Sequence, residues 1–296
     1  MKKIYIMLGS CIALLTACNS SQECKCFKNT AGYEAKINTS KTTNKPTTPR
    51  KIAVQMWSLH DVTLEEAIEK LKPVGINAIE CYPGQKISKK YPDVKLIPGM
   101  TNEQIDFVKK LVADAGMKIV SFGVASAKNE KEIEQLCAFA KQLGADKVIT
   151  EARVITFPAW QKYCEKYDMY MCLHHHALDA PNQYYDAYVV NKYTAPYSRI
   201  LGNPDVGHLV RSNINAVCTI RMLKGNIGSI HIKDEDAYGN HYSKACVLGQ
   251  GYVDIPNVLN ELDKQGYNGY FVIEYEDDWG KNIPHIKACV DYLKNN

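Results

Sequence analysis

The sequence lacks several features that would assign it to a class at once. No charge of one sign dominates, because 36 basic and 32 acidic residues are interspersed and leave a net charge of +4, so we expect no nucleic-acid partner. The apolar run Ile4–Leu15 is too short for a stable membrane span, which needs about 20 residues. Aliphatic residues are almost absent between Asn19 and Arg50, and such a segment cannot bury enough surface to fold.

The N-terminal segment has the features of an export signal. Lys2 and Lys3 precede the apolar run, which ends in Leu15-Thr16-Ala17-Cys18. This ending resembles the lipobox of bacterial lipoproteins. The resemblance implies that residues 1–17 are a signal peptide, that Cys18 carries a diacylglycerol, and that residues 18–50 form a disordered tether. The protein would then be a membrane-anchored lipoprotein of the cell envelope or periplasm; the alternative is an ordinary signal peptide with a chance cysteine.

Residues 51–296 have about the length of one barrel domain, roughly 250 residues. Short β-rich runs alternate with amphipathic helical runs throughout, which is typical of parallel βαβ units. We therefore predict an α/β fold, a single (β/α)8 barrel of the TIM type. A doubly wound open sheet is the alternative, but it would more often have a glycine-rich loop where this chain has Ser58-Leu59-His60-Asp61. The predicted strands are Lys51–Leu59, Ala78–Tyr82, Lys118–Val124, Lys147–Glu151, Met169–His176, a weaker one at Arg199–Leu201 or running into Asp205, Ser229–Lys233 and Tyr270–Tyr275.

The C-terminal ends of these strands are rich in residues that bind metals. Functional residues of a barrel lie at these ends, so acids and imidazoles there are candidates for one shared site. An ionised carboxylate inside a barrel mouth is costly unless it is paired or bound to a metal. Mixed oxygen and nitrogen donors suit Mn, Co, Zn, Fe or Mg without deciding among them. The candidates are Glu80, Tyr82, Glu151, the histidines 174–176, Asp205, His208, His231, Lys233, Asp234, Glu274 and Glu276.

The alternation of side chains along a strand assigns His174 and His176 to one face and His175 to the other. Cys172 continues the row of the first two, so we place that pair in the barrel interior. We interpret Glu276 as part of a solvated acidic turn rather than as a site residue.

Seven short motifs are spread along the predicted barrel. They are residues 52–59 (Ile-Ala-Val-Gln-Met-Trp-Ser-Leu), Ala78-Ile79-Glu80, the His-x-His of His174 and His176, Asp205-Val206-Gly207-His208, His231-Ile232-Lys233-Asp234, residues 249–254 (Gly-Gln-Gly-Tyr-Val-Asp) and Glu274. Together they resemble the xylose isomerase-like barrel superfamily, the group of sugar phosphate isomerases and epimerases, over the whole of residues 51–296. The group includes ketose 3-epimerases, inosose dehydratase, hydroxypyruvate isomerase and endonuclease IV.

The resemblance implies a metal site with a ligand on each of four strands. Asp205, His231 and Glu274 match three of the expected ligands. The fifth strand departs from the epimerase pattern, since its Glu-x-His reads His174-His175-His176, which looks more like the His-x-His of the inosose dehydratases. Glu151, one strand earlier, would then replace the missing acid as a ligand, with His176 beside it. The predicted metal ligands are Glu151, His176, Asp205, His231 and Glu274. The predicted catalytic residues are Glu151, Glu274, His176 and Lys233, and the predicted substrate-binding residues are Glu80, His174, His208 and Trp57.

The activity that the resemblance implies is that of a metal-dependent isomerase, epimerase or lyase. It would remove a proton next to the carbonyl of a small sugar or keto-sugar, and the fifth-strand histidines slightly favour elimination, in which an imidazole protonates the leaving oxygen. One alternative is a non-catalytic sugar-binding lipoprotein with a degenerate site. A glycoside hydrolase is weaker, since it usually needs two carboxylates and no metal. An endonuclease is not expected, and a homo-oligomer stays open.

Overall fold

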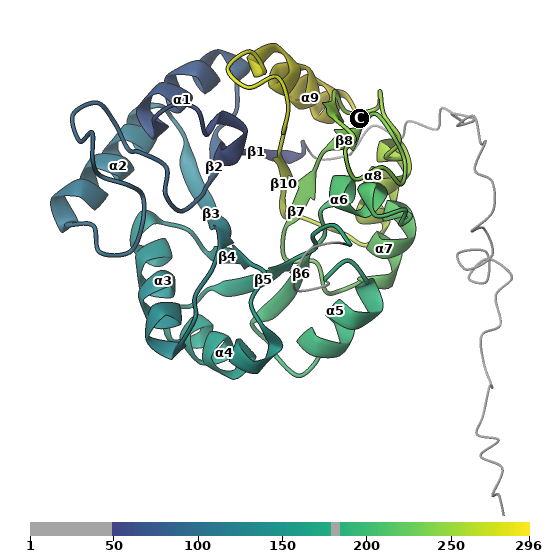
Figure 1. Cartoon of the computed structure of the whole chain (residues 1–296), viewed down its shortest axis with the longest axis horizontal. Helices are drawn as coiled ribbons and strands as arrows, with labels where there is room; N and C mark the ends of the chain where they lie inside the picture. The colour runs from purple at the N-terminus through teal and green to yellow at the C-terminus, as the bar shows by residue number, and fades with distance from the viewer. Residues whose placement is uncertain (1–48, 179–183) are drawn as a thin grey trace, which may run out of the picture. The chain divides into compact units, whose positions relative to one another are not determined.

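The computed structural model describes residues 49–178 and 184–296 of the chain. The predicted signal peptide, the predicted lipidation site Cys18 and nearly all of the predicted tether lie outside the described residues. Within them, eight parallel strands form a ring with helices around its outside (Figure 1). The strands are β1 (Lys51–Gln55), β2 (Ala78–Cys81), β3 (Lys118–Ala125), β4 (Lys147–Thr150), β5 (Tyr170–His174), β6 (Ile200–Asn203), β7 (Ile230–Ile232) and β10 (Tyr270–Ile273).

The ring closes into a barrel. Its strands pair in the order β6-β5-β4-β3-β2-β1-β10-β7. Two isolated parallel bridges close the gap between the two end strands, one from Gly202 in β6 to Ile227 before β7 and one from Asp205 after β6 to His231 in β7. The second bridge sets two predicted metal ligands side by side. The predicted TIM barrel is confirmed.

Several local elements differ from the prediction, among them the first strand, the segment after β6 and the hairpin after β7. The first strand ends at Gln55, and the chain continues as the 3-10 turn η2 (Met56–Leu59). The helix α6 (Val206–Arg211) was not expected, because six residues are too few for a helical period to show in the sequence. The other helices are α1 (Leu64–Leu71), α2 (Asn102–Asp114), α3 (Glu130–Leu143), α4 (Phe157–Lys166), α5 (Ala187–Thr194), α7 (Ala216–Met222), α8 (Ile255–Lys264) and α9 (Ile283–Asn295), with 3-10 turns η3 (Lys72–Val74) and η4 (Val154–Thr156) and a hairpin of β8 (Asp234–Glu235) and β9 (Ala245–Cys246).

The helices are amphipathic and pack one apolar face against the barrel. In α1, Leu64, Ile68 and Leu71 are buried on one side. The helix begins with a capping box, in which the Thr63 side chain accepts the Glu66 N–H and the Glu66 carboxylate accepts the Thr63 N–H. This cap fixes the point at which the chain turns from the end of η2 into the helix.

The inside of the barrel changes from apolar to polar along its axis. A small apolar cluster consists of Ala53, Ala78, Val120 and Val272. Because side chains alternate along a strand, the residue two positions further on also points inward. On β1, β2 and after β10 these residues are Gln55, Glu80 and Glu274, and all three are buried. A floor of small apolar side chains therefore lies beneath a layer of buried polar groups.

Arg50, which was predicted to end the tether, is held against the barrel. Its guanidinium binds the Asp263 carboxylate at 2.7 and 2.8 Å and lies 5.0 Å from the centre of the Phe271 ring. Among residues 49–178 and 184–296, no helix has the length and apolar character of a membrane span.

Candidate metal centre

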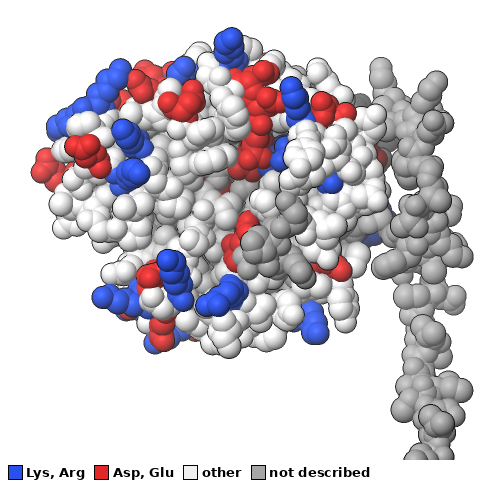
Figure 2. Space-filling view, in the orientation of Figure 1, with Lys and Arg blue, Asp and Glu red and all other residues white. Residues whose placement is uncertain are grey.

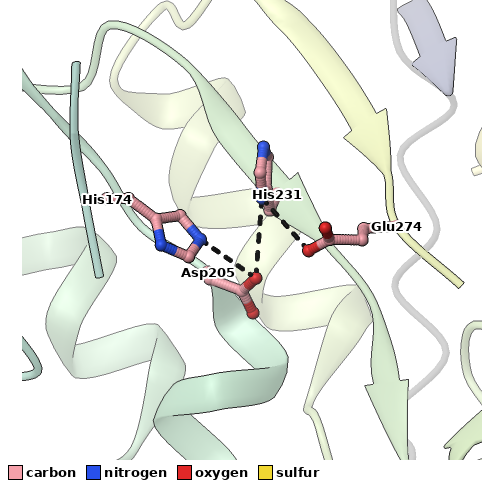
Figure 3. Close-up of side chains that lie close together, drawn as sticks. All are labelled: His174, Asp205, His231 and Glu274. Carbon is pink, nitrogen blue, oxygen red and sulfur yellow. Dashed lines mark ion pairs between the residues drawn. The ribbon is translucent and has the colours of Figure 1, made fainter. Parts of the chain in front are cut away.

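Four buried side chains converge at the C-terminal end of the barrel. His174 ends β5, Asp205 follows β6, His231 lies in β7 and Glu274 follows β10. Figure 3 shows the four side chains pointing toward one another. Each offers one donor atom, and these atoms all lie within 4.8 Å of one another. Two imidazoles and two carboxylates at this spacing suit a single divalent cation.

Three of the donor atoms lack hydrogen bonds within the described part of the chain. His174 Nε2, Asp205 Oδ2 and His231 Nδ1 are all buried and form none. The nearest charged groups belong to the cluster itself and to Lys233. They lie 3.0 to 3.6 Å from these atoms but do not form hydrogen bonds with them. Buried polar atoms normally have a partner. Three of them directed into one space therefore fit a bound cation.

A buried carboxylate orients His231. The imidazole Nε2 donates to Glu80 Oε1 at 2.7 Å. Glu80 is itself held by the side-chain amide of Gln55 at 2.7 Å and by the hydroxyl of Ser121. Since a carboxylate only accepts, Nε2 carries the proton and Nδ1 faces the cluster. Metal-binding histidines commonly have this outer support.

Glu151 supports His174 in a similar way. Its Oε1 lies 3.3 Å from His174 Nδ1, while the other ring nitrogen, Nε2, lies 3.5 Å from Asp205 Oδ2. Burial opposes protonation of His174, but these two carboxylates raise its pKa above the ordinary value. Each ring nitrogen of His174 therefore faces a different carboxylate.

The Asp205-Val206-Gly207-His208 motif positions one carboxylate. Asp205 is the N-cap of α6, and its Oδ1 accepts the His208 N–H at 2.9 Å, which leaves Oδ2 for the cluster. Burial opposes ionisation of Asp205, but the Lys233 ammonium and then His208 hold its pKa well below its usual range. Gly207 is needed for close packing, because a Cβ there would lie 2.4 Å from Lys233 Cγ.

Lys233 places a buried ammonium beside three carboxylates. Its Nζ lies 3.0 Å from Asp205 Oδ2, 3.0 Å from Glu274 Oε2 and 2.6 Å from Glu276 Oε2. Burial opposes the charge, but these carboxylates raise the pKa of Lys233 well above its ordinary value. Burial also opposes ionisation of Glu274, and Lys233 followed by His231 holds the pKa of that carboxyl below its usual range. The ammonium and the carboxylates thus keep one another charged.

The histidines of the centre differ in protonation. Burial opposes protonation of His231, but Glu80 and then Glu274 raise its pKa well above the ordinary value. His176 and His208 lie with ring centres 4.1 Å apart, and burial is the first cause that lowers the pKa of each. These two rings therefore stay neutral at a pH where His231 carries a second proton and a positive charge.

A cavity of about 350 Å3 opens above the cluster. In the space-filling view of this molecule, a band of acidic side chains runs toward the centre of the face (Figure 2). The cavity has both polar and aromatic walls, which suits a small polar ligand. It is lined by Gln55, Trp57, Tyr82, Pro83, Val124, Glu151, His174, His176, His208, Glu274 and Glu276.

The structure brings together most, but not all, of the residues that the sequence assigns to a metal. The three that converge are Asp205, His231 and Glu274. Their fourth neighbour is His174, which the sequence assigns to the substrate. Glu151 and His176 lie outside this group of four and line the cavity instead.

The residues assigned to the substrate are divided between the cavity and the interior. Trp57 and His208 line the cavity, whereas Glu80 is fully buried behind His231 and does not line it. The interpretation of Glu276 as a solvated turn is wrong, because it lines the cavity and binds Lys233 at 2.6 Å. The sequence did contain a sign of this position, because the alternation of side chains puts Glu276 on the same face as Glu274.

Asp234 explains the glycine-containing motif at residues 249–254. Its carboxylate accepts the backbone N–H groups of Gly249, Gly251 and Val253 at 2.8, 3.0 and 2.9 Å. A Cβ at Gly251 would lie 2.3 Å from the Glu235 carbonyl oxygen. The motif therefore holds the loop before α8 against the end of β7.

Comparisons with known proteins agree with this architecture. The family model described as xylose isomerase-like TIM barrel matches residues 162–295. A search of curated proteins gives no match. Among solved structures, an uncharacterised protein from Parabacteroides distasonis ATCC 8503 has 27% identity and a TM-score of 0.68, with coverage of 83% of this chain and 98% of that one.

Two similar structures have named activities. The probable 3-DHS dehydratase from Bacillus anthracis has 16% identity and a TM-score of 0.64, covering 83% of this chain and 99% of that one. D-allulose 3-epimerase from Methylomonas sp. has 12% identity and a TM-score of 0.67, covering 84% and 98%. At these identities the likeness establishes the fold. The chain is thus a TIM barrel similar to the xylose isomerase-like barrels.

Proposed function

We propose that the protein is a metal-dependent enzyme that acts on a small sugar or keto-sugar as an isomerase, epimerase or lyase. The reaction begins with removal of a proton next to a carbonyl. The observation that carries the proposal is the group of four buried donors beneath a cavity of about 350 Å3. The names of similar structures support it, since they include two 3-epimerases and a probable dehydratase.

We assign the cation to His174, Asp205, His231 and Glu274, with Mn, Co, Zn, Fe and Mg as candidates. A divalent cation at this place supplies Lewis acidity for a carbonyl oxygen. Glu151 supports His174 from the cavity side and remains close to the space that the substrate would occupy.

The proton is removed by a carboxylate of the cavity wall, Glu274 or Glu151. Lys233 keeps Glu274 ionised, because its ammonium lies 3.0 Å from Oε2, and an ionised carboxylate is the form that accepts a proton. His176 lies on the same wall, where an imidazole moves a proton to or from a leaving or reforming oxygen. Reprotonation of the carbon gives isomerisation or epimerisation, and loss of a neighbouring oxygen gives elimination.

The completeness of the centre favours an enzyme over a non-catalytic sugar-binding protein. A degenerate site would be expected to lose ligands or the residues that orient them. Here four donors converge, and each imidazole has a carboxylate at its other ring nitrogen, Glu80 for His231 and Glu151 for His174. Retention of both layers is typical of a working metal site.

The test is an assay of metal content and proton exchange on the same protein. Purified protein should contain about one divalent cation per chain by elemental analysis, and a chelator should remove it. Incubation with a panel of keto-sugars in D2O should place deuterium next to the carbonyl, and the metal-stripped protein should not do so. Sugar binding that is independent of metal, without deuterium exchange, would instead identify a binding protein.

We also propose, from the sequence alone, that Cys18 anchors the protein to a membrane of the cell envelope. Cys18→Ser should move the protein from the detergent-extracted membrane fraction to the soluble fraction and abolish labelling by a fatty-acid analogue. Cys24→Ser is the matched control and should retain the anchor. Membrane association that survives Cys18→Ser would contradict the proposal.

A further inference from the structure

Four aromatic rings lead outward from the cavity. Tyr82 and Trp57 line it, with ring centres 5.2 Å apart in an edge-to-face contact. Trp57 stacks on His60 at 4.5 Å, with 17° between the ring planes. His60 meets the ring of Trp279 at 4.4 Å and 74°. We call Tyr82, Trp57, His60 and Trp279 the aromatic shelf.

The shelf presents large aromatic surfaces to solvent. The chain has three tryptophans, of which Trp57 is 41% and Trp279 is 42% exposed, while Trp160 is fully buried. Trp279 does not line the cavity, so its exposed ring lies beyond the space above the metal cluster. Exposed aromatic rings that adjoin a cavity are typical of ligand contacts.

Hydrogen bonds fix the segments that carry the shelf. Ser58, next to Trp57, accepts the Tyr275 N–H on its hydroxyl at 2.8 Å and the Asn282 side-chain amide on its carbonyl at 2.6 Å. These bonds join η2 to the loop that carries Trp279. The backbone N–H of Trp57 also donates to Gln55 Oε1 at 2.9 Å. The side-chain amide of Gln55 donates to Glu80, the carboxylate that orients His231. The shelf is therefore held in place relative to the cluster.

We propose that the substrate is a glycoside, with its reacting ring in the cavity and a second sugar ring on the outer part of the shelf. The position of the reacting ring rests on the proposed function. A cavity of about 350 Å3 is small for a ligand pocket, since such pockets span about 300–1,000 Å3, so a larger molecule extends past its rim. A sugar ring has a face of C–H groups, which packs on the electron-rich face of an aromatic ring. The exposed ring of Trp279, in contact with His60, supplies such a surface at the rim.

The first test uses the intrinsic fluorescence of Trp279. In the variant Trp57→Phe it is the one exposed tryptophan, because Trp160 is buried. Glucose and galactose serve as single-ring probes, and cellobiose, maltose and lactose as two-ring probes. At least one two-ring sugar should protect Trp279 from acrylamide quenching at a concentration at which its component single rings do not. Equal protection by single-ring and two-ring sugars would overturn the proposal. A further probe, p-nitrophenyl glucoside, carries an aromatic ring in place of the second sugar, and protection by this compound alone would also overturn it.

The second test compares affinities by calorimetry. Trp279→Ala should lower the affinity for the best two-ring sugar relative to its single ring by about 3- to 10-fold, the effect of losing one aromatic partner. Tyr188→Ala removes an exposed aromatic residue from α5 and should leave this ratio unchanged. An unchanged ratio in Trp279→Ala would refute the shelf. Both tests measure binding, so a missing deuterium exchange would refute the proposed reaction without affecting them.

Discussion

His231 Nε2 and Glu80 Oε1 lie 2.7 Å apart, although 151 positions separate the two residues in the chain. Strands β2 and β7 are not neighbours, because β1 and β10 lie between them in the sheet. The hydrogen bond therefore crosses the barrel interior, and it fixes the imidazole from the side opposite the proposed metal.

Glu80→Gln tests this support. The substitution keeps the size of the side chain but replaces a charged acceptor, so the orientation and basicity of His231 should change. Outer partners of metal-binding histidines typically contribute about 10- to 100-fold to metal affinity, and we expect a loss of that size in competition with a chelating dye. Glu69→Gln, at an exposed position of α1, is the control. Unchanged affinity in Glu80→Gln would show that the contact does not support a metal ligand.

His174→Ala and His176→Ala distinguish the two ligand sets. The group of four contains His174, whereas the sequence assigns His176. We expect His174→Ala to lose most of its metal, measured by elemental analysis, and His176→Ala to keep it. Retention of metal by His174→Ala together with its loss in His176→Ala would restore the sequence-based assignment. Circular dichroism checks that both variants are folded.

Metal affinity should increase with pH. Burial opposes protonation of His231, but Glu80 and Glu274 raise its pKa well above the ordinary value, so its Nδ1 holds a proton that a cation must displace. Asp205 and Glu274 have lowered pKa values and stay ionised, so they add no proton in this range. His174, the other proposed imidazole ligand, also has a raised pKa, so up to two protons are displaced. Each displaced proton raises affinity by up to about tenfold per pH unit. Titration calorimetry in buffers of different ionisation enthalpy counts the protons, and a count of zero would contradict the assignment of His231.

Gly207→Ala should destabilise the barrel mouth. The added Cβ would lie 2.4 Å from Lys233 Cγ, a contact that requires the surroundings to shift. We expect the free energy of unfolding in urea to fall by about 1–3 kcal/mol, as for other overpacked sites. Since Lys233→Ala removes the contacted atom, the double variant should lose less stability than the two single variants together. If the losses of stability in the two single variants simply add up in the double variant, the crowding at Gly207 is relieved by groups other than the Lys233 side chain.

The sequence predicts which face of a strand a residue occupies better than it predicts how deep along the barrel axis its side chain lies. Alternation correctly placed His174 and His176 on the face that looks into the barrel. It could not show that His174 is the one at the cluster, because that depends on the shift of β5 against β6, in which His174 lies opposite Asn203. Such a shift is set by pairing between distant segments.

The same limit explains Glu80 and Gln55. Both were in motifs that the sequence analysis identified, and the register between β1 and β2 sets them opposite each other. Gln55 reaches the cavity wall, whereas Glu80 is fully buried and does not line the cavity. Glu276 shows the opposite case. It lies beyond the end of β10, near the mouth of the barrel, and it lines the cavity. Local pattern carries no information on this distance along the barrel axis.

The floor formed by Ala53, Ala78, Val120 and Val272 has a consequence for the order of binding. These side chains offer no donor to an ion, so exchange with solvent has to occur through the mouth. An ion and a sugar then share one entrance, with the ion at the deeper position. Loading with metal would precede loading with sugar, and a seated sugar would slow the escape of the ion beneath it.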